Sequence, residues 1–168
     1  MASTYEKIAT TTLTGTASEI SFASIPNTYT DIVMIVSGKS SSDDQIFLRY
    51  NTDTGNNYSE TRLSGNGTSA ASDRHSSVSF ITMSRYGYPS NTAGENVSIF
   101  QFMNYANTTT YKTCLSRVGI ASGGTDAVVG LWRSTAAIDT IKISTSGFST
   151  ATWQSGTTAT IYGILKAA

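Results

Sequence analysis

His75 is the only histidine in this chain of 168 residues, so nucleophilic catalysis that needs an imidazole base would have to use it. It lies in the polar run Asp73-Arg74-His75-Ser76, and no Gly-x-Ser-x-Gly turn presents a serine to a base. Cys114 is the only cysteine, and it is expected to be a small buried side chain in a strand. The sequence therefore predicts neither a serine nor a cysteine hydrolase.

Oxygen ligands at alternate positions around a glycine could bind calcium, and the best such segment is Asn51–Asn57, with Glu60 beyond it. The segment has few acidic residues and departs from the EF-hand spacing, so a plain turn at Asp53-Thr-Gly55 is favoured. Asp43-Asp44 is a second acidic pair, and we expect it in a solvated turn. One His and one Cys are too few for most zinc sites. We therefore expect no metal and no cofactor.

Two further classes of enzyme have no support in the sequence. A glycosidase needs two carboxylates in one groove, and nothing singles out a pair among the 11 acidic residues. The segment Ser122-Gly123-Gly124-Thr125 lacks the lysine and the following helix of a phosphate-binding loop. The chain is therefore not expected to be an enzyme, and a structural or binding role is favoured.

Aromatic side chains that could stack on sugar rings are the remaining candidates for a binding site. Tyr86 and Tyr88 share a face beside a loop, and Trp132 and Trp153 are the other candidates. Trp132 follows an apolar run, which favours a core position for its ring. Tyrosine and arginine are also enriched in protein–protein interfaces, so sugar binding and protein binding both stay open for Arg85 and the two tyrosines.

The charge balance limits the partners. Lys+Arg equal Asp+Glu, and charged residues make up 13% of the chain, against about 25% in typical domains. Nucleic acids and anionic membranes attract an excess of Lys and Arg, so neither partner is expected. Low charge also weakens the repulsion between copies of the molecule. The segment Met1–Lys7 has no apolar run of a secretory signal, and no stretch reaches the ~18 apolar residues of a membrane span, so we expect neither.

The elements that must position these residues are β-strands. No window has a persuasive period of 3.6, and short runs of β-branched and aromatic residues are separated by Gly, Asn, Asp and Ser. We predict an all-β protein: a single-domain antiparallel β-sandwich, jelly-roll-like, over residues 13–168, preceded by an N-terminal arm, 1–12, that leads into the first strand. The strands are expected at 6–12, 19–22, 31–36, 45–50, 78–83, 97–103, 111–118, 127–132, 138–144 and 157–165.

Three segments carry further expectations. Asp31–Val36 is almost continuously apolar, which predicts a central strand covered on both faces. Asn51–Ser77 and Ser84–Asn96 are polar and rich in turn residues, which predicts two long loops. Loops of this length in a compact domain are usually functional or flexible.

Five segments spread between Phe22 and Ile164 resemble a widespread family of tailed-bacteriophage virion proteins. The segments are Phe22–Asp31, Arg49–Ser59, Met103–Thr113, Val129–Ile138 and Ile161–Ile164. They occur in the order found in the family, whose members are stand-alone small virion proteins or domains of larger tail and fibre proteins. The resemblance carries over no catalytic residues. It implies a component of the phage particle without fixing its position there.

Two functions follow from this resemblance. The first is a capsid decoration (cement) protein: a homotrimer on the outer head surface that binds the major capsid protein or other virion proteins and stabilises the shell. The alternative is a tail, fibre or knob component that binds a host glycan through the two long loops. Either way the protein is made in the host cytoplasm and located in the virion. The residues expected in the interaction surface are Tyr5, Glu6, Lys7, Ile8, Arg85, Tyr86 and Tyr88.

Overall fold

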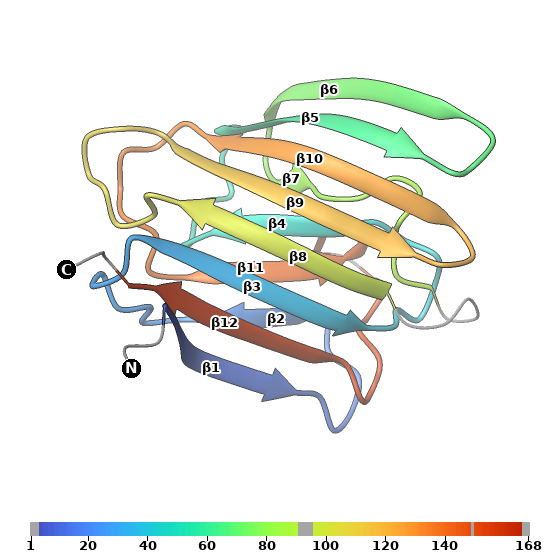
Figure 1. The fold of residues 1–168 in the computed structure, drawn as a ribbon, viewed down its shortest axis with the longest axis horizontal. Coiled ribbons are helices and arrows are strands. Elements are labelled where there is room, and N and C mark those ends of the chain that lie inside the picture. Colours follow the sequence, from blue (N-terminus) through green and yellow to red (C-terminus); the bar gives the residue numbers. More distant parts are fainter. Residues whose placement is uncertain (1–3, 91–95, 149, 166–168) are drawn as a thin grey trace.

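Two antiparallel β-sheets packed face to face make up the computed structural model, which describes residues 4–90, 96–148 and 150–165 (Figure 1). The wide sheet has the strand order β1-β12-β3-β8-β9-β10-β5-β6, and the narrow sheet has the order β2-β11-β4-β7. The strands are β1 (Tyr5–Thr12), β2 (Glu19–Phe22), β3 (Asp31–Gly38), β4 (Ile46–Tyr50), β5 (Tyr58–Gly65), β6 (Ala70–Val78), β7 (Ile81–Thr82), β8 (Asn96–Met103), β9 (Lys112–Ile120), β10 (Gly124–Trp132), β11 (Ile141–Thr145) and β12 (Thr158–Ile164), with a short 3-10 turn, η1 (Ser146–Phe148).

The strand order is that of a jelly roll with two inserted hairpins. Without the hairpins, strands that follow one another along the chain alternate between the quartets β1-β12-β3-β8 and β2-β11-β4-β7, except for β4 and β7, which pair with each other in the narrow sheet. The β5–β6 hairpin comes between β4 and β7, and β9 and β10 come between β8 and β11. Both hairpins extend the wide sheet beyond β8 (Figure 1). The prediction of an all-β, jelly-roll-like sandwich is confirmed. No helix among the described residues is long and apolar enough to cross a membrane.

The core lies between the two sheets, and β3 shows how the sequence divides between its faces. Ile32, Met34 and Val36 are fully buried, whereas Val33 is half-buried and Ile35 is 38% exposed. The prediction that this strand is covered on both faces is therefore wrong. Side chains alternate across a strand, and the narrow sheet covers only one face of the wide sheet.

The two tryptophans and the cysteine are core residues. Trp132 is 2% exposed and Trp153 is 0% exposed, so the core position favoured for Trp132 is confirmed and neither ring is available for sugar stacking. Cys114 is fully buried as expected, and burial raises the pKa of its thiol to about 11.

Two predictions about the middle of the chain are wrong. The expected long loop Asn51–Ser77 contains the β5–β6 hairpin, and the expected strand 78–83 is divided between the end of β6 and the short β7. Ser77, with a φ of 56°, adopts a left-handed backbone conformation at the end of β6. The second predicted loop, Ser84–Asn96, has no strand in residues 84–90, while residues 91–95 lie outside the described residues.

The predicted N-terminal arm is mostly a strand. Tyr5–Thr12 form β1, an edge strand that pairs antiparallel with β12 of the same chain. The register shifts by one residue between Lys7 and Ala9. Residues 1–3 of the predicted arm lie outside the described residues.

Candidate interaction surface

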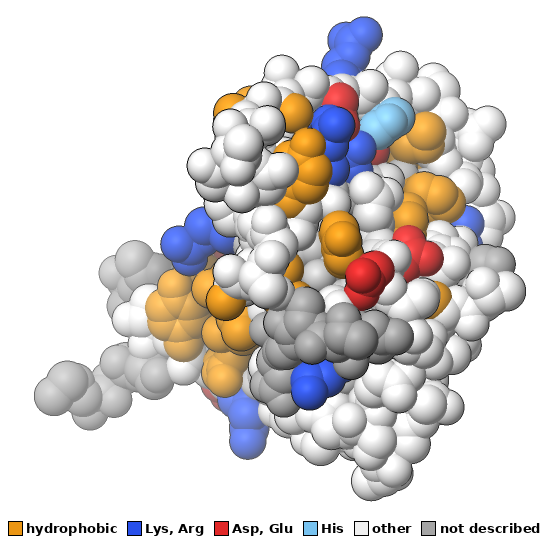
Figure 2. Space-filling model, turned by 90° about the vertical axis from the view of Figure 1, so that its right-hand side faces the viewer, with side chains coloured by type: hydrophobic (Ala, Val, Ile, Leu, Met, Phe, Trp, Pro, Cys, Tyr) orange, Lys and Arg blue, Asp and Glu red, His pale blue; other side chains and the backbone are white. Residues whose placement is uncertain are grey.

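The wide sheet presents apolar side chains to solvent on the face turned away from the narrow sheet, which is the front of the molecule in Figure 1. We call this surface the outer face. Leu63 is 62% exposed there, Val129 53% and Leu115 40%. Strand pairing aligns the outer-face residues in two adjacent rows, Leu63, Ala127, Arg117, Ile99 and Ile35 in one and Thr61, Val129, Leu115, Gln101 and Val33 in the other. The end view in Figure 2 shows hydrophobic side chains at the surface with Lys and Arg side chains near them.

The charged side chains within the strands of the outer face are cationic, apart from one at its margin. Lys7, Arg74 and Arg117 are exposed there, and Arg133 follows the end of β10. Asp31 is the marginal carboxylate, at the start of β3, and its Oδ1 accepts a backbone N–H at 2.8 Å. The other described acids lie on loops, in the interior, in the narrow sheet or on the inner side of edge strands, away from the outer-face rows. The outer face is thus apolar and positively charged.

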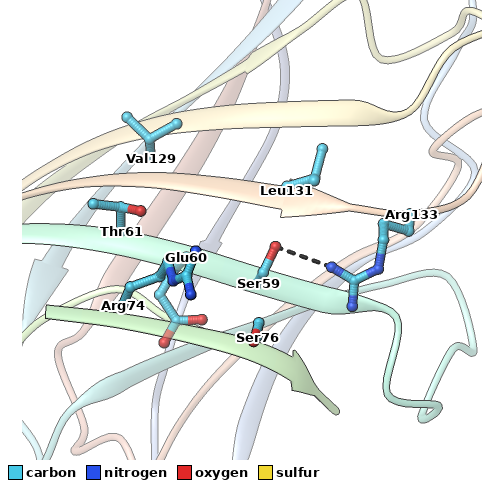
Figure 3. Close-up of a pocket in the computed structure, with 8 residues that line it drawn as sticks. All are labelled: Ser59, Glu60, Thr61, Arg74, Ser76, Val129, Leu131 and Arg133. Carbon is cyan, nitrogen blue, oxygen red and sulfur yellow. Dashed lines mark hydrogen bonds between the residues drawn. The ribbon is translucent and has the colours of Figure 1, made fainter.

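A hollow of about 370 Å³ lies at the β5–β6 end of the outer face (Figure 3). Val129 and Leu131 on β10 supply an apolar wall, and Arg74 and Arg133 come from different elements beside it (Figure 3). The residues that line the hollow are Ser59, Glu60, Thr61, Arg74, Ser76, Val129, Leu131 and Arg133.

Neither guanidinium of the hollow is paired with a carboxylate of the described chain. Arg133 donates to the hydroxyl of Ser59 (3.1 Å) and to the backbone carbonyls of Asn56 (3.2 Å) and Tyr58 (3.3 Å). The side chain of Arg74 is exposed, and its guanidinium makes no hydrogen bond or ion pair with any described residue. Both positive charges therefore remain available to an anion.

The carboxylate of Glu60 does not compensate these charges, because it is buried on the inner side of the sheet, where it pairs with His75. Its side chain is fully buried and its Oε1 lies 2.9 Å from Nδ1 of His75. The other oxygen, Oε2, has no hydrogen-bond partner among the described residues. Burial raises the pKa of Glu60 against the opposing effects of His75 and Arg62. His75 thus lies in strand β6 beside a buried acid, and not in a loop as expected.

Replacing Glu60 by glutamine is expected to stabilise the fold by about 1 kcal/mol at pH 8 and by less at pH 4. Because the pKa of Glu60 is raised in the folded state, its stabilising contribution is complete below the unfolded pKa of about 4.3 and is lost as pH rises through the folded pKa. Glutamine resembles the protonated acid and retains an oxygen for His75. Urea denaturation from pH 4 to pH 8 measures the difference between the two proteins, and a difference that does not grow with pH would contradict the assignment.

The predicted interaction residues of loop 84–90 are held within the fold. Oδ2 of the buried Asp126 accepts the backbone N–H groups of residues 85–87, at 2.7, 3.0 and 2.7 Å. The guanidinium of Arg85 donates to Asp73 at 2.9 Å and lies 5.2 Å from the ring centre of Tyr86. Arg85, Tyr86 and Tyr88 are half-buried, so this loop is an anchored segment.

The predicted arm residues divide between the two sides of β1. Tyr5 and Lys7 pair with outward-facing residues of β12 and reach the margin of the outer face, whereas Ile8 packs against the core. Glu6 is exposed beside Tyr29 and acts with burial to raise the pKa of that phenol. The arm is on the edge strand β1, and loop 84–90 is bonded to β10, so the structure does not bring the two predicted groups together.

The outer face itself was missed by the sequence analysis, although β10 carried a signal for it. Val128 on one side of this strand is buried, whereas Val129 on the other side is 53% exposed. Leu63 was missed because its strand was assigned to a loop. An apolar residue on the second side of a strand indicates either a second covering layer or an exposed interaction surface.

Two of the five segments that carry the resemblance, Arg49–Ser59 and Val129–Ile138, meet in a network of hydrogen bonds around Asp53. The carboxylate of Asp53 accepts bonds from the Trp132 indole N–H (2.6 Å), the Asn57 amide (3.0 Å) and the Gly55 backbone N–H (2.8 Å). The hydroxyl of Tyr58 donates to the Asp53 carbonyl at 3.1 Å. Asp53 therefore lies in the turn that was predicted at Asp53-Thr-Gly55, and its carboxylate oxygens accept hydrogen bonds from N–H groups. The described residues contain no cluster of three or more His, Cys, Asp or Glu that could hold a metal ion.

Asn51 links the same two segments of the chain. Its Oδ1 accepts the backbone N–H groups of Asp139 (3.0 Å) and Thr140 (3.2 Å), and its Nδ2 donates to the carbonyl of Ala137 (3.0 Å). Asn51 has a φ of 52°, a left-handed conformation that asparagine tolerates better than most residues. The hydrogen bonds of Asp53 and Asn51 thus tie the two segments together at one end of the sandwich.

No protein-family model and no curated protein matches this chain. The resemblance to phage virion proteins therefore stays a prediction.

Proposed function

We propose that this chain is a structural protein of a tailed-bacteriophage particle and decorates the outer surface of the head. The resemblance of five segments to virion proteins supports a place in the particle, and the jelly roll is a fold found in viral capsid proteins. The observation that carries the binding role is the outer face, with exposed apolar rows and cations within it.

The partner that best fits the outer face is a shell protein with an apolar surface that also carries carboxylates. Exposed apolar rows of this kind mark interaction sites on soluble proteins. A twofold contact of the outer face with itself would bring Arg74 and Arg117 toward other cations, which disfavours that pairing. The major capsid protein is therefore the proposed partner. A homotrimer is the proposed assembly, because three copies around a local threefold axis meet equivalent shell subunits.

Two measurements test this proposal. The purified chain is expected to sediment with heads that lack it and to saturate a fixed number of sites per head, and free protein at every head concentration would contradict the proposal. Light scattering at micromolar concentration is expected to give three times the 17.8 kDa chain mass, and a monomer mass would contradict the trimer.

The alternative is a tail, fibre or knob component that binds a host glycan. The hollow between Arg74 and Arg133 is the observation that favours it, because part of the segment assigned to glycan binding from the sequence forms β5 and β6 beside this hollow. Sedimentation with tails instead of heads would support this alternative over decoration.

A further inference from the structure

We propose that the hollow between Arg74 and Arg133 binds a carboxylated sugar residue, such as the uronic acid unit of a polysaccharide. This inference concerns the isolated chain and does not depend on where the chain lies in a particle. It rests on the charges, the hydroxyl groups and the apolar wall that meet in the hollow (Figure 3).

The two guanidiniums favour a carboxylate. A guanidinium is planar, stays charged at neutral pH and matches the two oxygens of a carboxylate. The guanidinium of Arg74 has no bond to any described residue, and that of Arg133 donates to neutral oxygens at 3.1–3.3 Å. Glu60 is the acid among the lining residues, and its side chain is fully buried against His75. Asp73, next to Arg74 in sequence, is paired with Arg62. An incoming carboxylate therefore meets two cations and no competing anion in the hollow.

The remaining groups favour a sugar ring over an acidic peptide side chain. The hydroxyls of Ser59, Thr61 and Ser76 line the hollow, and each can both donate to and accept from a sugar hydroxyl. Val129 and Leu131 offer apolar surface to the C–H groups of a ring. An acidic side chain would use the guanidiniums and leave the three hydroxyls without a partner from the ligand.

The size of the hollow is that of a small-molecule site. Its volume of about 370 Å³ falls at the lower end of the roughly 300–1,000 Å³ typical of ligand pockets. The hollow therefore holds one sugar unit of a longer chain. The affinity for that isolated unit is expected in the millimolar range, since the arginines are open to solvent.

Nuclear magnetic resonance titration of the isotope-labelled full chain tests the proposal with three probes. Methyl glucuronide is expected to shift the backbone amide signals of Ser59, Thr61, Ser76 and Val129. Methyl glucoside, which carries a neutral hydroxymethyl group in place of the carboxylate, and acetate, which lacks the ring, are each expected to bind at least about tenfold more weakly. Absence of shifts with the glucuronide overturns the proposal. Acetate binding as tightly as the glucuronide also overturns it, and would make the hollow a general carboxylate site that an acidic peptide could fill.

A pair of arginine variants locates the site. Arg74→Gln is expected to weaken glucuronide binding about tenfold, because it removes an exposed cation that has no structural partner. Arg117→Gln is the matched control, since Arg117 is exposed on the same face but lies outside the lining of the hollow. Equal losses in the two variants would overturn the assignment and indicate attraction to the whole face. A failed titration leaves the decoration proposal standing, because that proposal is tested with heads.

Discussion

The Asp53→Ala variant is expected to lose about 2–4 kcal/mol of free energy of unfolding. The substitution removes the acceptor of the Trp132 indole N–H and leaves this buried donor without a partner. It also removes the bonds from Asn57 and Gly55 that hold the turn after β4. Urea denaturation followed by tryptophan fluorescence measures the loss.

Asp139→Ala is the control for this variant, because Asp139 is exposed and its carboxylate accepts only the neighbouring Thr140 hydroxyl among the described residues. Its free energy of unfolding is expected to change by about 0.5 kcal/mol or less. Equal losses in the Asp53 and Asp139 variants would contradict a central role for Asp53.

The loss in Asp53→Ala is expected to shrink in acid. Burial alone raises the pKa of Asp53, but hydrogen bonds from Trp132, Asn57 and Gly55, with the charge of Arg49, outweigh it and hold that pKa below its usual value. A depressed folded pKa gives stability that is present above the unfolded pKa of about 3.9 and is lost as pH falls through the folded value. The wild-type protein should therefore approach the variant in stability below about pH 4. A difference that stays constant with pH would show that the carboxylate charge contributes nothing.

The second large effect is expected at the outer face. Val129→Asp and Leu115→Asp are each expected to weaken binding to heads that lack the protein by about 100-fold, because each places a carboxylate in the centre of the apolar rows. Their free energies of unfolding should change by about 0.5 kcal/mol or less, since both side chains are substantially exposed. Sedimentation with heads and urea denaturation measure the two quantities separately.

Ser21→Asp is the control for these variants. Ser21 is an exposed strand residue of the narrow sheet, so the same charge is added to the opposite layer of the sandwich. Its binding to heads is expected to match the wild type. If the outer-face variants bind heads normally but change the mass of the protein in solution, the outer face joins copies of this chain and the proposed shell contact is wrong.

The strands that alternate cleanly between apolar and polar residues could be predicted from the sequence. The limits of β2 were predicted to the residue, and the side chains of β2 alternate between buried Ile20 and Phe22 and the more exposed Glu19 and Ser21. The inner face of β2 is apolar, so the period of two is visible in the sequence.

The β5–β6 hairpin could not be predicted in this way because its inner face carries charge. Glu60 and Arg62 point inward and are buried against His75 and Asp73, which lie on β6. Arg62 forms a two-bond pair with the Asp73 carboxylate, at 2.7 and 2.9 Å. A polar residue that is buried with a partner from another strand has the sequence pattern of an exposed one. The hairpin was therefore assigned to a loop.

The candidate surface was missed for a related reason. The sequence showed that β3 and β10 have apolar residues on both sides, but the number of layers that cover a strand depends on the whole topology. The wide sheet has eight strands and the narrow sheet four, so the second side of β3 and β10 has no covering layer in the described chain. Contacts of Arg85 with Asp73 and of loop 84–90 with Asp126 are likewise tertiary, which is why the loop was expected to be free for binding.

The copy number of this chain in purified particles of the phage proposed to encode it tests the central proposal most directly. Quantitative mass spectrometry gives the ratio of this chain to the major capsid protein. Decoration of the head predicts hundreds of copies per particle, in a fixed ratio to the shell subunits. A handful of copies would contradict decoration and place the chain on the tail or at a vertex, and absence from the particle would contradict the virion role altogether.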